Sequence, residues 1–159
     1  MQENNYLSEQ QDYYRQQQHQ PGWQNVVQVL FSGIQANADS ADGRAFIRNM
    51  GTQLAQHNPL PISQTVGEFE DQINHLWSRY HWGFLRIAAN EQEMQLSHCA
   101  WPDTDNLTEQ SQWKTAFATF LEGIYKEWLR QQGGQSEVNV RWLDNKTEGP
   151  LVFRYKNGI

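Results

Sequence analysis

The residues with the clearest chemical potential are Ser97-His98-Cys99, which place a hydroxyl, an imidazole and a thiol next to one another in the chain. Such groups form a catalytic pair only when one reaches the other as nucleophile and base. The apolar alternation around them predicts a β-strand, on which neighbouring side chains point to opposite faces. Cys99 is therefore a poor partner for His98, and a strand cysteine near tryptophans is typical of a small buried apolar residue.

The other ligand-type residues lack the spacing of a metal or phosphate site. The five histidines show no pair on one helix face, and the single cysteine offers neither an internal disulfide nor a zinc framework. The glycines are scattered singly apart from Gly133-Gly134, so a glycine-rich phosphate loop is missing. We therefore expect no metal site and no cofactor.

Carboxylates are the remaining candidates for catalysis, because a glycosidase needs two of them facing one cleft. Glu68, Glu70 and Asp71 fall at the start of an expected helix, where negative charge favours the helix dipole. Glu122 and Glu127 fall on the polar side of another, with cations nearby for pairing. These patterns indicate solvated faces and helix caps, so we expect a protein that is not an enzyme.

The elements that would carry these residues are predicted from apolar periodicity and its breaks. Three helices are expected first, over 23–36, 39–57 and 65–80. Two hairpins follow, with strands at 82–87 and 93–98 and at 138–143 and 151–156, and a long helix over 113–129 lies between them. The prediction is one α+β domain, helices packed with two antiparallel β-hairpins, in the order ααα-ββ-α-ββ.

Length and composition agree with this and exclude several classes. A chain of 159 residues suits a single domain, and a net charge of −6 argues against a nucleic-acid partner. No apolar run is long enough to span a bilayer, and the first residues lack the features of a secretory signal, so a cytoplasmic location is expected.

Aromatic residues exceed the needs of one small core. The chain holds seven Trp, seven Phe and six Tyr. The surplus indicates self-association or stacking against flat ligands such as sugar rings, unless all the tryptophans are ordinary core residues. The stripe on the long helix is also wider than one core contact requires, so we expect it to divide between core and subunit contact. The residues expected at this oligomer interface are Phe117, Leu121, Tyr125 and Trp128.

Residues 1–21 differ from the α+β domain expected over 22–159. Seven of the first twenty positions are Gln, interleaved with tyrosines, and the segment ends at Pro21-Gly22. Because it has no sustained apolar period, we expect it to be flexible or only weakly helical. It is a solvated tail, a segment that becomes ordered on a partner with its tyrosines as contact points, or, less favoured, an aggregation-prone prion-like segment.

Two stretches match a known pattern. One runs from Arg44-Ala45-Phe46-Ile47-Arg48-Asn49-Met50-Gly51 through Thr65-Val66-Gly67-Glu68 to Trp82-Gly83-Phe84-Leu85, and the other is Phe120-Leu121-Glu122-Gly123-Ile124-Tyr125-Lys126-Glu127-Trp128-Leu129. Together they resemble the bacterial cellulose synthase operon protein D family, over about residues 23 to 156. The most specific pieces are the Trp-Gly pair before a strand and the Leu-Glu-Gly-x-Tyr-x-x-Trp helix.

The resemblance implies a non-catalytic accessory subunit of bacterial cellulose synthesis and secretion. In that family, dimers assemble into an octameric ring, a tetramer of dimers, whose passages guide nascent β-1,4-glucan chains and promote ordered or crystalline cellulose. The N-terminal segments line those passages. Its implied partners are the cellulose synthase complex at the inner membrane and a proline-rich scaffold protein.

The composition of residues 1–21, taken with that family role, gives a hypothesis for the glucan contacts. Amides donate and accept hydrogen bonds as sugar hydroxyls do, and they carry no charge that would hold a chain tightly. The residues expected to contact glucan are Tyr6, Tyr13, Tyr14 and Gln17.

Two alternatives remain open. A small acidic dimeric chaperone or adaptor for secreted proteins shares the size, acidity and α+β layout, and its groove would bind a peptide rather than a sugar. An enzyme acting on β-glucan is the third and least favoured alternative.

Overall fold

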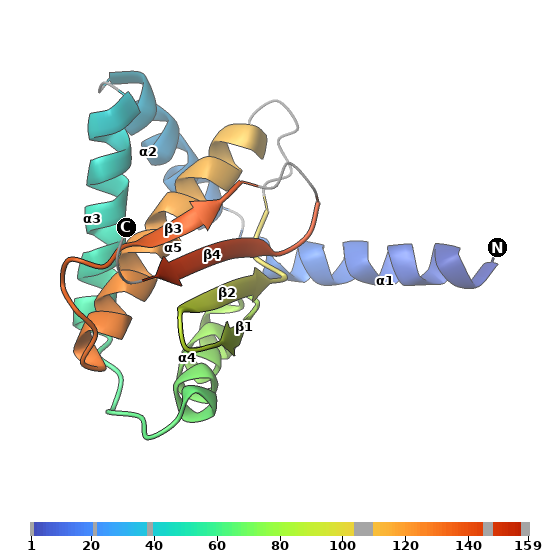
Figure 1. Ribbon diagram of the computed structural model, residues 1–159. Helices are drawn as coiled ribbons and strands as arrows, with labels where there is room; N and C mark the ends of the chain where they lie inside the picture. Colours follow the sequence, from blue (N-terminus) through green and yellow to red (C-terminus); the bar gives the residue numbers. More distant parts are fainter. Residues whose placement is uncertain (1, 21, 38–39, 104–109, 145–147, 157–159) are drawn as a thin grey trace.

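A computed structural model describes the chain apart from residues 1, 21, 38–39, 104–109, 145–147 and 157–159 (Figure 1). It confirms an α+β fold with an antiparallel sheet. In chain order the elements are α1 (Gln2–Gln18), α2 (Trp23–Asn37), α3 (Ser40–His57), α4 (Val66–Tyr80), β1 (Phe84–Ala89), β2 (Glu93–Cys99), α5 (Gln110–Gln131), β3 (Val140–Leu143) and β4 (Leu151–Lys156).

The two expected hairpins join into one four-stranded sheet with the order β1-β2-β4-β3. The junction is an antiparallel pairing of β2 with β4, in which Leu96 lies opposite Phe153. Both side chains are fully buried, so this pairing puts the apolar faces of the two hairpins into one core.

The start of α4 follows the predicted capping spacing. The Glu68 backbone N–H donates to Thr65 Oγ1 at 3.1 Å. The Glu68 carboxylate reaches back one residue further than in a standard capping box and accepts from the Gln64 backbone N–H at 2.7 Å. Both ends of the motif therefore satisfy backbone donors at the helix start.

Helix α5 is the centre of the domain, packed against α3 and against the sheet (Figure 1). The crossing with α3 is close enough that a Cβ on Gly51 would meet the Phe120 carbonyl oxygen, and one on Gly123 would meet the Arg48 carbonyl oxygen. Gly83 plays a similar part before β1, because its φ of +86° and the nearby Cys99 carbonyl oxygen both exclude a side chain. Gly51, Gly83 and Gly123 of the family-like motifs are therefore packing requirements.

The breadth of the α5 stripe has a different cause from the one expected. Phe117 is 3% exposed, and Leu121, Tyr125 and Trp128 are 0% exposed. With α3 and the sheet both packed on it, one chain alone fills the whole stripe. The assignment of these four residues to an oligomer interface is corrected: they belong to the core.

The N-terminal segment, expected to be flexible or only weakly helical, forms the helix α1 over residues 2–18, which projects away from the body (Figure 1). Its last turn is anchored where the Gln18 side-chain amide donates to the Ala100 carbonyl oxygen at 2.7 Å. Within the described residues, no helix is long and apolar enough to cross a membrane.

Candidate functional site

His98 is held in a chain of hydrogen bonds inside the core. Its Nε2 lies 2.6 Å from the Trp82 carbonyl oxygen, which can only accept, so the ring proton is on Nε2. The Tyr125 hydroxyl then donates to Nδ1 at 2.5 Å, and the Trp77 indole N–H donates to the Tyr125 oxygen at 3.0 Å. Burial lowers the pKa of His98 to about 4, so the ring is neutral at pH 7 and both nitrogens are engaged.

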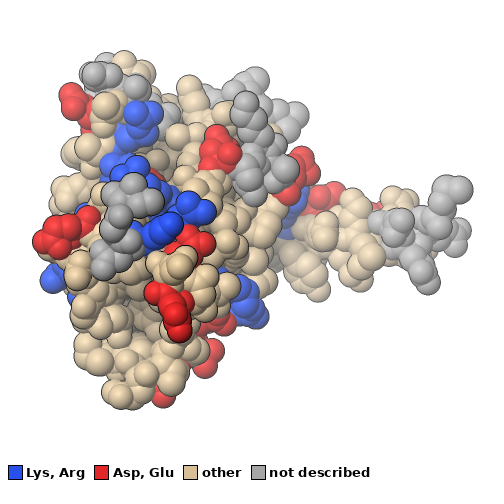
Figure 2. Space-filling model, viewed as in Figure 1, with Lys and Arg blue, Asp and Glu red and all other residues tan. Residues whose placement is uncertain are grey.

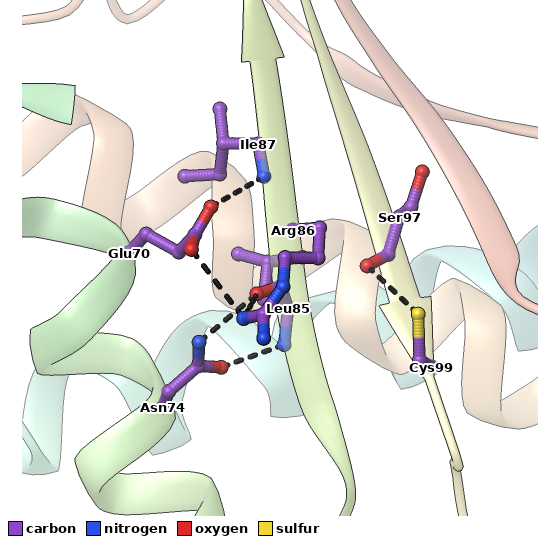
Figure 3. Close-up of polar contacts among 7 residues, drawn as sticks. All are labelled: Glu70, Asn74, Leu85, Arg86, Ile87, Ser97 and Cys99. Atoms are coloured by element: carbon purple, nitrogen blue, oxygen red, sulfur yellow. Dashed lines mark hydrogen bonds and ion pairs between the residues drawn. The ribbon is translucent and has the colours of Figure 1, made fainter. Parts of the chain in front are cut away.

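Cys99 is equally unsuited to nucleophilic chemistry. The alternation of burial along β2 puts His98 on the core side and Cys99 on the other side. Its Sγ contacts the Ser97 carbonyl oxygen at 3.8 Å (Figure 3). Burial raises the pKa of the thiol, which keeps it protonated at neutral pH.

The carboxylate of Glu70 and the amide of Asn74 hold the outer edge of β1 (Figure 3). Asn74 donates to the Leu85 carbonyl oxygen at 2.9 Å and accepts from the Leu85 backbone N–H at 2.6 Å. Glu70 accepts from the Ile87 backbone N–H at 2.7 Å. These α4 side chains occupy backbone groups that an edge strand would otherwise leave open.

The carboxylates of α5 are also structural. Glu122 accepts from the Trp142 backbone N–H at 2.9 Å, on the other edge strand, and pairs with Arg48 at 3.1 Å. Glu127, expected on a solvated face, is only 5% exposed and binds Arg130 through both carboxylate oxygens, at 2.7 and 2.9 Å. This hydrogen bonding lowers the pKa of Glu127, so it stays ionised at neutral pH. In the described part of the chain, no cluster of His, Cys, Asp or Glu could hold a metal ion.

A groove of about 1110 Å³ lies where α1 meets the body. One wall comes from the C-terminal half of α1 and the other from the chain after β2, the start of α5 and strand β3. The lining residues that matter for its chemistry are Gln11, Tyr14, Gln17, Trp101, Lys114 and Trp142.

The Trp101 ring on the body side of the groove is held in place by a hydrogen bond and a ring contact. The Trp101 indole N–H donates to the Gly149 carbonyl oxygen at 3.0 Å, and its ring stacks on Phe117 with 6.5 Å between centroids. Lys114 Nζ lies 6.0 Å from the centre of the Trp142 ring. Flat rings beside side-chain amides suit a neutral ligand rich in hydroxyl groups.

Charge around this region is mixed. The groove is lined by Arg15 and Lys114 but also by Asp103, Asp144 and Glu148. On the face drawn in Figure 2, Lys and Arg lie among Asp and Glu without forming a field of one sign. Such a surface does not select an ionic polymer.

The structure brings together only part of the residues predicted to contact glucan. Tyr14 and Gln17 line the groove. Tyr13 packs edge-on against Tyr14 at 5.8 Å, and Tyr6 lies further out on α1, both of them more than half exposed. The sequence did not reveal the body wall, because Trp101 and Trp142 come from separate elements that meet only in the folded chain.

Comparisons with known proteins agree with the sequence resemblance. A family model described as the D subunit of cellulose synthase matches residues 9–156. A cellulose synthase operon protein D of Komagataeibacter xylinus is 28% identical over 116 residues, 72% of this chain and 73% of that protein. The protein of the same name from Komagataeibacter sucrofermentans is 26% identical over the same shares. The family match runs from α1 to β4 and includes the groove, and the chain therefore belongs to the cellulose synthase D-subunit family.

Proposed function

We propose that this protein is a non-catalytic accessory subunit of bacterial cellulose synthesis and secretion, and that the groove beside α1 guides nascent β-1,4-glucan chains. Membership of the family supports a part in cellulose synthesis. One observation carries the finer proposal: Tyr14 and Gln17 of α1 line the same groove as Trp101 and Trp142 of the body.

The chemistry of the groove supports guiding rather than cleavage. Aromatic rings offer flat apolar faces to sugar rings, and glutamine amides exchange hydrogen bonds with sugar hydroxyls. The two carboxylates of α5 considered for catalysis are engaged elsewhere: Glu122 binds Arg48 and a strand backbone, and Glu127 binds Arg130. A ligand held through neutral contacts can move on as the chain grows.

Further parts of the proposal rest on the family. Copies of the chain form an octameric ring, a tetramer of dimers, whose passages order the glucan chains into crystalline cellulose. The ring lies on the cytoplasmic side, bound to the inner-membrane synthase complex and to a proline-rich scaffold protein.

A matched set of α1 variants tests the groove. Tyr14→Ala with Gln17→Ala alters the groove wall, whereas Tyr13→Ala with Gln16→Ala makes the same changes on neighbouring exposed positions outside it. We expect the first pair to lower affinity for a soluble cello-oligosaccharide and to reduce cellulose crystallinity in cells, with a smaller effect from the second pair. Unchanged binding and cellulose order in the groove pair would contradict the proposal.

A secretion adaptor remains the second candidate, and one observation favours it. Helix α2 exposes apolar side chains, Trp23 at 78% and Leu30 at 58%, which could receive a protein client. An adaptor should bind an apolar peptide and ignore cello-oligosaccharides, so the same titration separates the two functions.

A further inference from the structure

Helix α2 is attached to the body along one side. Phe31 packs against Trp113 and Phe120, with ring centroids 5.8 and 6.4 Å apart. The Gln24 side-chain amide donates to the Asp103 carbonyl oxygen at 2.7 Å. These contacts fix which face of α2 turns inward.

Other apolar residues of α2 stay exposed beside the anchored face, with Val27 at the border between the two, three residues after Gln24 and four before Phe31. Trp23, Val27 and Leu30 follow one another at spacings of four and three, the spacing of a helix-pairing seam, and Val26 lies beside them. Their exposed fractions are 78% for Trp23, 37% for Val27, 58% for Leu30 and 50% for Val26. We name these four residues the α2 seam. A seam of this kind fits another helix.

The absence of charged residues from α2 indicates which helix pairs with the α2 seam. Residues 23–37 contain no Asp, Glu, Lys or Arg, whereas α1, α3, α4 and α5 each carry charges of both signs. The whole chain carries −6, so two copies repel each other on the whole. A second copy can approach the uncharged α2 seam with the smallest electrostatic cost.

The sheet edges are poor alternatives for pairing. At β1, Asn74 and Glu70 already bind the backbone groups of Leu85 and Ile87. At β3, Glu122 binds the Trp142 backbone N–H. A strand from another copy would have to break these charge-assisted and amide hydrogen bonds, which favours contact through helices.

From these observations we infer that the α2 seam is the surface through which two copies of this chain pair, α2 against α2 about a two-fold axis. A two-fold contact uses the same patch on both partners, and a seam of apolar side chains is complementary to itself. The inference rests on the proposed function in one respect: the α2 seam is the surface through which the copies of the proposed ring pair. Since Trp23 follows Gln18 closely in the chain, pairing here sets the grooves of two copies near their shared interface.

Two neighbouring substitutions on α2 test the inference by light scattering on a sizing column. Leu30→Glu puts a charge in the α2 seam, and Val29→Glu puts the same charge on a 71% exposed position outside it. We expect the wild type and Val29→Glu to share one mass that is a multiple of 18.6 kDa, and Leu30→Glu to fall to half of that mass or less. Circular dichroism should match in all three proteins.

Each other result has a definite meaning. Leu30→Glu at the wild-type mass overturns the α2 seam but leaves the assembly of the proposed function standing. A wild type of 18.6 kDa overturns both.

A cysteine series decides the matter if Leu30→Glu loses helical signal. In a Cys99→Ser background, Val27→Cys and Leu30→Cys should each cross-link into a covalent dimer on oxidation, and Val29→Cys should not. An assembled protein in which neither seam cysteine cross-links overturns the inference.

Discussion

Tryptophan and tyrosine side chains are exposed in the N-terminal region, α1 and α2, and buried or half-buried in the body from α3 to β4. In the body, Trp77, Tyr125 and Trp128 are fully buried, and their polar atoms have hydrogen-bond partners. In the N-terminal region, Tyr14 is 65% exposed and Trp23 is 78% exposed. The same residue types are therefore buried in one region and exposed in the other.

The difference in exposure indicates that the body is packed within one chain, whereas the N-terminal region leaves apolar surface for other molecules. The body fills its own core and pairs the polar atoms of His98, Tyr125 and Trp128 inside it. The N-terminal region leaves large apolar rings in water, and removing that apolar surface from water by a bound partner is favourable. In our proposals glucan covers the groove side of α1, and a second copy covers the α2 seam.

The largest expected effect contrasts one tryptophan from each region. Trp128→Ala removes a fully buried ring whose N–H donates to the Asn58 carbonyl oxygen at 2.9 Å, and should cost about 3–5 kcal/mol of unfolding free energy. Trp23→Ala removes an exposed ring and should cost less than about 0.5 kcal/mol in the unassembled chain. Denaturant unfolding of both variants at one low protein concentration measures the two losses of unfolding free energy. Equal losses would contradict the prediction.

The second-largest expected effect is a loss of stability of the body at low pH. Because burial holds the pKa of His98 at about 4 in the folded protein against 6.5 in the unfolded chain, the unfolded state binds more protons between these values. The part of the unfolding free energy that depends on neutral His98 is fully present above pH 6.5. It falls as the pH drops toward 4, by about 3 kcal/mol in total. A His98→Gln variant should lose this pH dependence and exposed His75→Gln should keep it; identical pH profiles for all three proteins would be the contrary result.

A pair of glycines gives the smallest expected effects, and with opposite signs. Gly123→Ala forces a methyl group against the Arg48 carbonyl oxygen and should destabilise the domain by about 1–3 kcal/mol. A Cβ on Gly33 of α2 meets nothing within 4 Å, so Gly33→Ala should stabilise its helix by about 0.5–1 kcal/mol. Unfolding at equal protein concentration compares them, and a loss for Gly33→Ala would show that α2 is more tightly packed than the exposed fractions indicate.

Local pattern was enough to predict most of the fold. The helices α2 to α5 and all four strands follow from apolar periods and their breaks at Pro59, Trp101-Pro102 and Gly133. Helix α1 was expected only as a flexible or weakly helical segment, because its 17 residues are mostly polar and leave no clear apolar period. The joining of the two hairpins was missed because the pairing of β2 with β4 links strands that are far apart in the sequence.

The site was less accessible to sequence reasoning, for a related reason. Composition drew attention to Tyr14 and Gln17, which do line the groove, but the opposite wall depends on tertiary packing that brings Trp101 and Trp142 together. An apolar stripe predicts that a helix face will be buried, but it does not identify the element or partner that covers that face. The stripe of α5 is covered within the chain, and most of the apolar face of α2 is left exposed.

The central claim is that glucan contacts the groove and leaves the aromatic core untouched. The most direct test follows the tryptophan indole N–H signals by NMR while a cello-oligosaccharide is titrated into the protein, with signals assigned by Trp→Phe variants. We expect the signals of Trp101 and Trp142, which line the groove, to shift and that of Trp128, which does not line it, to stay in place. Unmoved signals from both groove tryptophans at saturating sugar would contradict the account.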